Sequence, residues 1–318
     1  MYMYAANCQR KWKGSKMKNK ALSESYAIIR GKASDNITSG CVVVEGGGFR
    51  GIYAAAALDA LMKNDINLSC LVGVSAGALN GMNYISGQIG RAATITLNHR
   101  ADKNYVGLRP FIKDKGIFGF GYAFGKLMKK YPFDWERFNS GNQRFIIVTT
   151  NMKTGDTEYF ENGSCDIFKA LQASSSLPYA SSPVIINGTP YLDGGCSSKL
   201  PYNWALENGY KKIIVIKTQH SDFRKPKDSK YSEFMFNNYF YKYKNFAKKL
   251  SQNNEIYNRQ LDELDRLKND GSVFVINPTS KVDVKRFESD IQKLYSLYEM
   301  GYNDTLALIP QIKEYLKK

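Results

Sequence analysis

Residues 41–84 read CVVVEGGGFRGIYAAAALDALMKNDINLSCLVGVSAGALNGMNY, and this stretch decides the fold. Its first five residues are an apolar, β-branched run that predicts a buried strand, and residues 51–62 predict a helix. Residues 68–74 predict a second strand, which is followed by a segment able to start another helix. This alternation is typical of an α/β fold in which helices cover a mostly parallel sheet.

The rest of the chain extends this pattern and then departs from it. Further strands are predicted at 144–150, near 184 and at 212–218, and such a sheet places binding groups at the carboxyl ends of its strands. After His220 the sequence predicts helices rich in Tyr, Lys and Asn, one strand at 273–278 and two closing helices. We therefore expect a basic N-terminal arm (1–40), a central α/β domain (41–220) and a mainly helical C-terminal extension with one strand, packed on that domain (221–318).

The chain carries a large excess of positive charge. Its 318 residues include 45 Lys or Arg and 29 Asp or Glu, a formal net charge of +16. Anionic partners such as phospholipid surfaces and nucleic acids are therefore electrostatically favoured. The first forty residues hold eight of the basic side chains and two of the acidic ones. This arm is either a solvated, partly disordered segment or a device that steers the chain to anionic membranes.

The cysteines and the apolar segments indicate in which cellular compartment the protein is expected. The five cysteines form no CxxC pair, which favours free thiols and a reducing compartment. No segment resembles the apolar core of a signal peptide or the length of a membrane span. We expect a cytoplasmic protein with peripheral contact to anionic membrane surfaces, in an oligomeric state that stays open. The cysteines are Cys8, Cys41, Cys70, Cys165 and Cys196, of which Cys41 and Cys70 lie in apolar runs that suit core packing.

The first chemical signal is GGGFRG at 46–51, directly between a predicted strand and a predicted helix. Successive glycines let backbone amides turn toward a bound anion, either a phosphate or the oxyanion of an acyl-transfer intermediate. Gly46, Gly48 and Gly51 also match the GxGxxG pattern of dinucleotide-binding loops. By itself this segment does not distinguish the two chemistries.

The second signal is GVSAG at 73–77, with a predicted strand before it and a predicted helix after it. This is the context that a GxSxG nucleophile elbow requires, because its glycines allow a sharp turn that lifts the serine hydroxyl into a cleft. Ser75 is therefore the predicted nucleophile. The other residues of the elbow are Gly73, Val74, Ala76 and Gly77.

A nucleophilic serine needs a base, and the sequence restricts the choice because it contains only two histidines. His99 lies in a polar stretch, whereas His220 follows a predicted strand and is the one realistic candidate for a Ser-His-Asp triad. The alternative base is Asp193 in TPYLDGG, where Gly194 and Gly195 allow a tight turn that aims the carboxylate at a neighbouring strand end. A chain so poor in histidine favours the aspartate.

Together, these three segments resemble the patatin-like phospholipase family, whose members carry a GGGxRG loop, a GxSxG elbow and a later DGG or DGA in this order. The chain has GGGFRG, GVSAG and DGG between Gly46 and Gly195, without departure from the pattern. Its segment IQKLYSLYEMGYND (291–304) is also similar to bacterial, intracellular members. The resemblance implies a three-layer patatin-like fold, with a mostly parallel central sheet between helices, and makes 41–220 the catalytic domain.

The resemblance also implies roles for single residues. In this family the counterpart of Ser75 attacks the acyl carbonyl, the counterpart of Asp193 accepts its proton directly, and amides of the glycine loop hold the oxyanion. For this chain it implies hydrolysis of lipid esters through an acyl-serine intermediate and a Ser-Asp dyad, without a cofactor. Arg50 would either stabilise the glycine loop or bind a phosphate. The oxyanion or substrate-binding residues would be Gly46, Gly47, Gly48, Phe49, Arg50 and Gly51, with the amides of Gly47, Gly48 and Phe49 as donors.

Three alternatives stay open. Capture of the acyl intermediate by an alcohol would make the protein a transacylase, and an inactive hydrolase would be a lipid-binding scaffold. The GxGxxG pattern and the positive charge would suit a non-catalytic nucleotide-binding or nucleic-acid-binding protein. That reading is disfavoured because Asp65 lies in a predicted turn and not at a strand end, where an acid that binds ribose would lie. We therefore expect no nucleic-acid partner.

Two further expectations concern metals and the stretch 107–133. No acidic cluster has the spacing of a calcium loop and neither histidine has a partner at metal-ligand spacing, so we expect metal-independent catalysis. Residues 107–133 are dense in glycine, aromatic residues and lysine. They form either a lid or interfacial patch or an ordinary loop and helix that cross the sheet.

Overall fold

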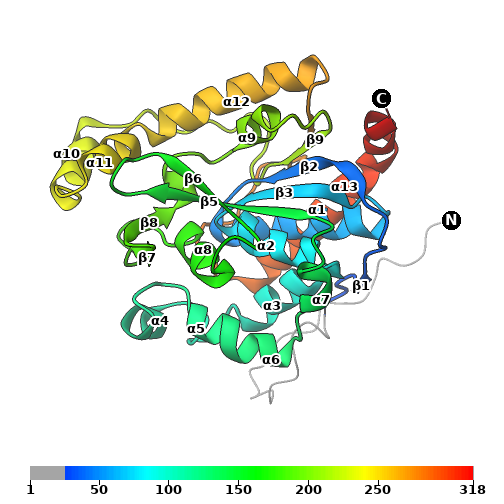
Figure 1. Cartoon of the computed structure of the whole chain (residues 1–318), viewed down its shortest axis with the longest axis horizontal. Coiled ribbons are helices and arrows are strands. Elements are labelled where there is room, and N and C mark those ends of the chain that lie inside the picture. The colour runs from blue at the N-terminus through cyan, green and yellow to red at the C-terminus, as the bar shows by residue number, and fades with distance from the viewer. Residues whose placement is uncertain (1–25, 318) are drawn as a thin grey trace, which may run out of the picture.

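The computed structural model describes residues 26–317, and its centre is a sheet flanked by helices (Figure 1). Within these residues the sheet has eight strands in the order β10-β9-β2-β3-β5-β8-β7, with β6 paired to β5 off this path. Neighbours from β10 to β5 are parallel, whereas β6, β7 and β8 pair antiparallel. The strands are β2 (Thr38–Val44), β3 (Leu68–Val74), β5 (Arg144–Asn151), β6 (Thr157–Glu161), β7 (Val184–Ile186), β8 (Thr189–Asp193), β9 (Ile213–Ile216) and β10 (Phe274–Ile276).

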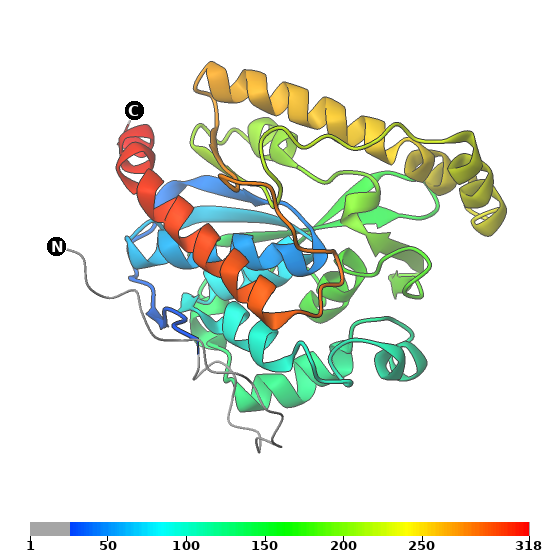
Figure 2. The same ribbon diagram turned by 180° about the vertical axis from the view of Figure 1, so that it is seen from behind.

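The middle parts of the central strands are apolar on both faces because helices cover both faces of the sheet (Figures 1 and 2). In β2, Val42 and Val44 join the core on one face, and Cys41 and Val43 join the core on the other. The predicted α/β fold with a mostly parallel sheet between helices is confirmed. The first face carries α1 (Gly51–Lys63), α2 (Ala76–Ile85), α3 (Arg91–His99), α8 (Ile167–Ser174) and α13 (Ile291–Lys317), and the second carries α9 (Tyr202–Glu207) and α12 (Asn253–Asn269).

Shorter elements surround this core. A small antiparallel pair joins β1 (Gly31–Lys32) to β4 (Gln88–Ile89). The four described cysteines, Cys41, Cys70, Cys165 and Cys196, are free thiols, as predicted. None of the described helices is long and apolar enough to cross a bilayer. The remaining helices are α4 (Leu108–Lys113), α5 (Phe120–Tyr122), the π-helical turn η3 (Ala123–Leu127), α6 (Met128–Lys130), α7 (Trp135–Phe138), α10 (Lys230–Tyr239) and α11 (Lys244–Ser251), with single 3₁₀ turns at η2 (Gly48–Arg50) and η4 (Gly194–Cys196).

The C-terminal helix α13 packs along α1 on the first face of the sheet (Figure 2). Gly301 allows this close approach, because a Cβ at that position would lie 2.5 Å from the carbonyl oxygen of Tyr53. Two hydrogen bonds join the helices: Tyr298 donates to Asp59 in a buried bond and Tyr53 donates to Asp304 in a partly buried one, each at 3.1 Å. The helix pair therefore depends on both shape and polar contacts.

The prediction of two closing helices was wrong, because α13 runs without a break through Pro310. Proline lacks the N–H that would reach the carbonyl of Leu306 one turn earlier. Leu306 is 44% exposed, so water can take the place of that donor. The division into arm, domain and extension stays a prediction, and residues 1–25 of the arm lie outside the described part of the chain.

Strand register brings the predicted site residues to one place. β6 pairs with residues 146–150 of β5 along one edge of that strand. β3 and β8 therefore share its other edge in succession, with Val74 opposite Val148 and Asp193 opposite Thr149. Since Val148 and Thr149 are consecutive, the ends of β3 and β8 meet head to head. The residue that follows Val74 is Ser75.

Candidate active site

Ser75 occupies the sharp turn between β3 and α2. Its backbone angles are φ 55° and ψ −123°, a region that costs a non-glycine residue energy and persists only where the surroundings hold it. The turn is tight because Gly77 lies against β2, where a Cβ would come within 2.4 Å of the Val44 carbonyl oxygen. The Ser75 amide donates to the Ser174 hydroxyl on α8 at 2.9 Å. Ser75 is thus held from two sides and is 8% exposed.

Asp193 lies beside Ser75 at the end of β8. Its Oδ1 accepts a hydrogen bond from the Gly195 amide at 2.7 Å, whereas Oδ2 is buried without a hydrogen-bond partner among the described residues. Burial raises the pKa of the Asp193 carboxyl, and the nearby Ser75 hydroxyl, the Gly195 amide, Arg286 and Lys199 oppose this rise. No hydrogen bond of ordinary geometry joins Oδ2 to Ser75 in this described region. The unpartnered oxygen is chemically able to accept a proton.

The GGGFRG loop forms the third side of the site. In the described part of the chain the amides of Gly47 and Gly48 have no hydrogen-bond partner, and both glycines line a cavity at Ser75. The Phe49 amide instead donates to the Arg286 carbonyl at 3.0 Å. Phe49 is therefore not free to donate to an oxyanion, which corrects that expectation. The amides of Gly47 and Gly48 stay predicted donors.

Neither histidine lies at this site. His220 accepts a hydrogen bond from the Asp222 amide at 3.3 Å, and its Nδ1 lies 3.6 Å from the Asp222 carboxylate. His99 is buried on α3, with Nε2 3.2 Å from the Tyr131 hydroxyl. Neither ring lines the cavities that open at Ser75. Within residues 26–317, no three His, Cys, Asp or Glu side chains gather as a metal site would require.

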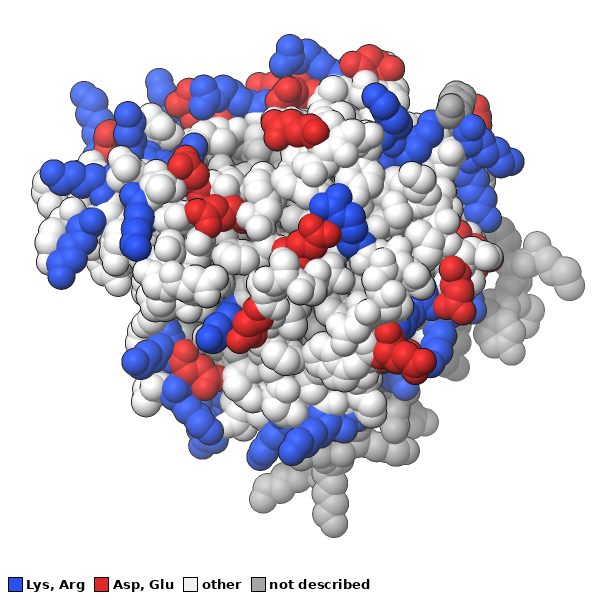
Figure 3. Space-filling view, in the orientation of Figure 1, with Lys and Arg blue, Asp and Glu red and all other residues white. Residues whose placement is uncertain are grey.

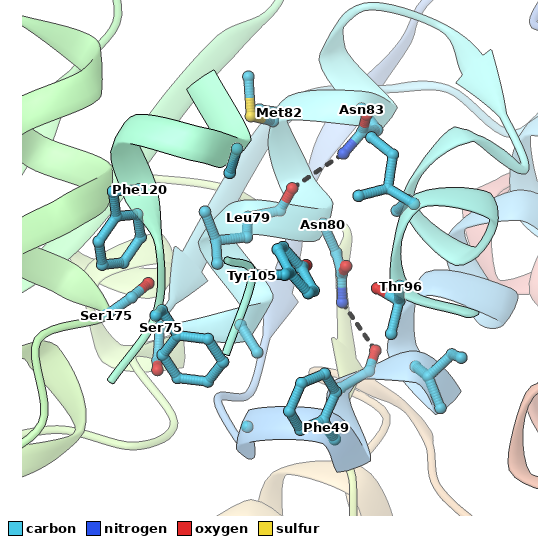
Figure 4. A pocket seen from close by; sticks show the side chains of 18 of the residues that line it. Phe49, Ser75, Leu79, Asn80, Met82, Asn83, Thr96, Tyr105, Phe120 and Ser175 are labelled. Atoms are coloured by element: carbon cyan, nitrogen blue, oxygen red, sulfur yellow. Dashed lines mark hydrogen bonds between the residues drawn. The ribbon is translucent and has the colours of Figure 1, made fainter. Parts of the chain in front are cut away.

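Two cavities meet at Ser75 and Gly48. We call the first the apolar chamber, which has a volume of about 120 Å³ and extends from Ser75 toward Thr96 on α3 (Figure 4). Residues 118–128 form one wall, so the stretch whose role the sequence left open encloses this chamber. Most of the lining is apolar, as a pocket for a hydrocarbon chain requires. Its apolar side chains include Phe49, Ile52, Leu79, Met82, Ile95, Phe118, Phe120, Phe124 and Met128.

We call the second cavity the cationic chamber, which has a volume of about 270 Å³ and lies on the Asp193 side of Ser75. Four basic side chains line it, together with the carboxylates of Glu45 and Asp193. Sequence reasoning singled out one of the four, Arg50, because it belongs to the glycine loop. The other three lie in segments without a motif. The one weak sequence signal for any of them is that Lys199 follows DGG by a few residues. The basic side chains are Arg50, Lys199, Lys225 and Arg286.

Two segments of the chain match models of known families. The model of the patatin-like phospholipase family matches residues 42–206, and a domain of unknown function, DUF6363, matches residues 243–317. The uncharacterized protein YjjU of Escherichia coli is 28% identical over 183 residues, which are 56% of this chain and 51% of YjjU. Lysophospholipase NTE1 of Scheffersomyces stipitis is 26% identical over 193 residues, which are 58% of this chain and 12% of NTE1. The chain thus spans about half of one relative and a small part of the other.

A solved structure is similar over most of the chain. VipD of Legionella pneumophila aligns with 93% of this chain and 71% of its own chain, with a TM-score of 0.43 and 12% sequence identity. The family match is independent of that alignment. It covers more than half of the chain, and its residues include the glycine loop, the elbow and the acidic turn. The chain therefore belongs to the patatin-like phospholipase family.

Proposed function

We propose that this protein is a serine acyl hydrolase that cleaves ester bonds of lipids, with Ser75 as nucleophile and Asp193 as base. The observation that carries the proposal is the head-to-head meeting of β3 and β8 on one edge of β5, which brings a strained serine to a carboxyl oxygen without a partner. Family membership supports a lipid ester as the substrate, and several yeast relatives are named lysophospholipases.

In the first half of the reaction, the Ser75 Oγ attacks the acyl carbonyl carbon while Asp193 Oδ2 takes the hydroxyl proton. Negative charge moves to the carbonyl oxygen, where the amides of Gly47 and Gly48 donate to it. The Ala76 amide, in the first turn of α2, is a third candidate donor, because amides at a helix start have no intrahelical acceptor. The C–O bond then breaks, and the alcohol leaves with the proton from Asp193. An acyl-Ser75 ester remains.

In the second half, water replaces the alcohol. The water oxygen attacks the carbonyl carbon of acyl-Ser75 while Asp193 takes one of the water protons. When the second tetrahedral intermediate collapses, Ser75 leaves with that proton and a fatty acid is released. The apolar lining of the 120 Å³ chamber supports its assignment to the acyl chain in both halves.

The test is turnover of a lysophospholipid and of p-nitrophenyl butyrate by the wild type beside Ser75→Ala. We expect the substitution to abolish hydrolysis of both and to remove labelling by a fluorophosphonate probe, while circular dichroism stays unchanged. His220→Ala should keep full activity, since its ring lies outside both chambers. Full activity of Ser75→Ala would end the proposal. Product analysis with glycerol present separates hydrolysis from acyl transfer.

We also propose that this enzyme meets anionic membranes with the end of the molecule that carries α4 and α10. Both helices lie at the same end in two opposite views (Figures 1 and 2). Leu108 and Ile112 on α4 are 77% and 78% exposed, and Tyr231 and Phe234 on α10 are 74% and 62% exposed. On the face seen in Figure 3, many of the side chains at this end are lysine or arginine, with some acidic side chains among them. Exposed apolar side chains beside cations suit the boundary of an anionic bilayer.

Vesicle flotation tests this contact. Phe234→Ser combined with Ile112→Ser should weaken binding to vesicles that contain phosphatidylglycerol by about tenfold, because both side chains lose their insertion into the bilayer. Leu306→Ser, which removes a half-exposed leucine from α13, is the matched control and should leave binding unchanged. Equal binding by the wild type and the double variant would refute this contact.

A further inference from the structure

The cationic chamber contains more positive charge than its own carboxylates neutralise. Arg50, Lys199, Lys225 and Arg286 line it, and none of the four forms an ion pair with a carboxylate in the described chain. Lys199 Nζ and Arg50 Nε are buried and have no hydrogen-bond partner within residues 26–317. Buried donors are normally satisfied, so unsatisfied cations point to an absent anion.

The four side chains also repel one another. Burial, followed by Lys225, lowers the pKa of Lys199 to about 7. Burial and then Arg286 lower the pKa of Arg50, and burial, Arg286 and Arg50 lower the pKa of Lys225. Each of these shifts reports a cation in a place that disfavours positive charge. A bound anion would reverse this preference for Lys199, Arg50 and Lys225 at once.

The two carboxylates at this cavity are engaged with other groups. Glu45 accepts hydrogen bonds from the amide and the hydroxyl of Thr218, at 2.6 and 3.0 Å, and from the Tyr257 hydroxyl. Asp193 accepts from the Gly195 amide and is the base of the proposed reaction. Four basic side chains therefore face two carboxylates, and neither carboxylate forms an ion pair with them.

The location of the four basic side chains relative to Ser75 indicates which part of a substrate they would contact. Ser75 lines both chambers, so an ester held at its hydroxyl extends in two directions. With the acyl chain in the apolar chamber, the alcohol part of the ester enters the cationic one. We propose that Arg50, Lys199, Lys225 and Arg286 form a subsite for a phosphate group on that alcohol part, and that the enzyme prefers lipid esters with a net anionic head.

This subsite rests on the hydrolase function proposed above and adds a substrate class to it. A phosphate monoester presents several acceptor oxygens, which suit guanidinium and ammonium donors. A choline head carries a quaternary ammonium group that the four cations would repel. We therefore expect the enzyme to prefer a phosphate monoester head over zwitterionic and neutral heads.

The experiment compares three lipids with the same acyl chain: lysophosphatidic acid, lysophosphatidylcholine and monoacylglycerol. We expect the wild type to favour lysophosphatidic acid in kcat/KM by about tenfold or more, because charge-assisted hydrogen bonds are lost with the other heads. Arg286→Gln and Lys225→Gln should each reduce this ratio about tenfold. Lys285→Gln and Lys227→Gln remove neighbouring exposed lysines outside the chamber, and they should leave the ratio unchanged.

A second arm separates a lipid head from free phosphate. Inorganic phosphate should inhibit wild-type hydrolysis of p-nitrophenyl butyrate competitively, and less so in Arg286→Gln. Inhibition of this kind without any preference among the three lipids would overturn the assignment to the substrate and leave a site for free anions. Equal ratios in the wild type and both variants would overturn the subsite itself. Absence of Ser75-dependent hydrolysis of the butyrate ester would instead refute the proposed function.

Discussion

The two chambers that meet at Ser75 are built in different ways. The apolar chamber takes its walls mainly from α2, α3 and residues 118–128, each of which contributes at least two apolar side chains. The cationic chamber takes one basic side chain from each of four separate loops, from the GGGFRG loop to the connection before α13. A substrate with its ester at Ser75 therefore has its two ends in opposite environments. Polarity alone can fix its orientation.

The largest effect should come from Asp193→Asn, which disables catalysis whichever chamber the substrate fills. We expect kcat to fall by about 10⁴-fold, because the amide cannot accept the Ser75 proton. Since burial raises the pKa of Asp193, kcat/KM of the wild type should fall as pH drops through that pKa, at a higher pH than for an ordinary aspartate. Hydrolysis of p-nitrophenyl butyrate across pH measures both.

The same raised pKa has a consequence for stability, and its sign can be worked out. Between the pKa of an unfolded aspartate and the raised folded value, the folded chain binds more protons at Asp193 than the unfolded chain does. Stability from this group is therefore present at low pH and is lost as pH rises through the folded pKa. Asp193→Asn should remove that loss and melt no lower than the wild type at neutral pH. The control for the activity measurement is Asp222→Asn, which changes a carboxylate beside His220. If Asp222→Asn reduced kcat as much as Asp193→Asn does, the assignment of Asp193 as the base would be contradicted.

The next effect should come from Gly48, which lines both chambers. Its φ is +60°, and a Cβ would come within 2.4 Å of the Arg286 carbonyl oxygen. Gly48→Ala should therefore displace the loop and its amides and reduce kcat by about 10²-fold or more. Gly141→Ala is a matched control, because its φ of +78° imposes similar backbone strain but no atom lies within 4 Å of the added Cβ. Wild-type kcat in Gly48→Ala would show that this loop does not hold the oxyanion.

Much of the fold follows from local sequence. The runs at 41–45, 68–74 and 144–150 are mainly apolar, with apolar residues at consecutive positions, so they predict central strands without any knowledge of their partners. Their order in the sheet was not predictable, because pairing depends on contacts between distant segments. The continuous α13 was missed for a different reason: the exposure of Leu306, which makes Pro310 tolerable, is set by tertiary packing.

The candidate site was predictable only in part. Ser75 and Asp193 belong to short motifs whose chemistry dictates their residues, and strand register then brings them together. Lys225 and Arg286 have no such signal, since a single basic residue in a polar loop is indistinguishable from a solvated one. The engagement of the Phe49 amide by Arg286 was equally invisible, because the acceptor is a backbone carbonyl more than two hundred residues away.

A smaller effect should come from Ala92→Phe, which changes the apolar chamber and leaves the cationic chamber as it is. Ala92 on α3 lines only the apolar chamber, and Ala92→Phe would fill part of its 120 Å³. We expect kcat/KM for a long-chain lysolipid to fall about tenfold, with less effect on a butyrate ester, because each excluded methylene removes favourable burial. Ala101→Phe adds the same side chain at an exposed position just beyond α3 and should change neither. Equal losses on both esters would show that the acyl chain does not lie there.

The smallest effect should come from Tyr257→Phe, which tests why the cationic chamber keeps its charge. The Tyr257 hydroxyl donates to the buried Glu45, and its ring lies 5.5 Å from Lys199 Nζ. The substitution keeps the ring but leaves Glu45 one donor short, so the free energy of unfolding should fall by about 1–3 kcal/mol. Urea unfolding measures this change, with exposed Tyr241→Phe as the control. If Glu45 then turned to pair with Arg50, preference for an anionic head would weaken as well. A stability loss with unchanged preference would show that Thr218 alone keeps Glu45 away from the cations.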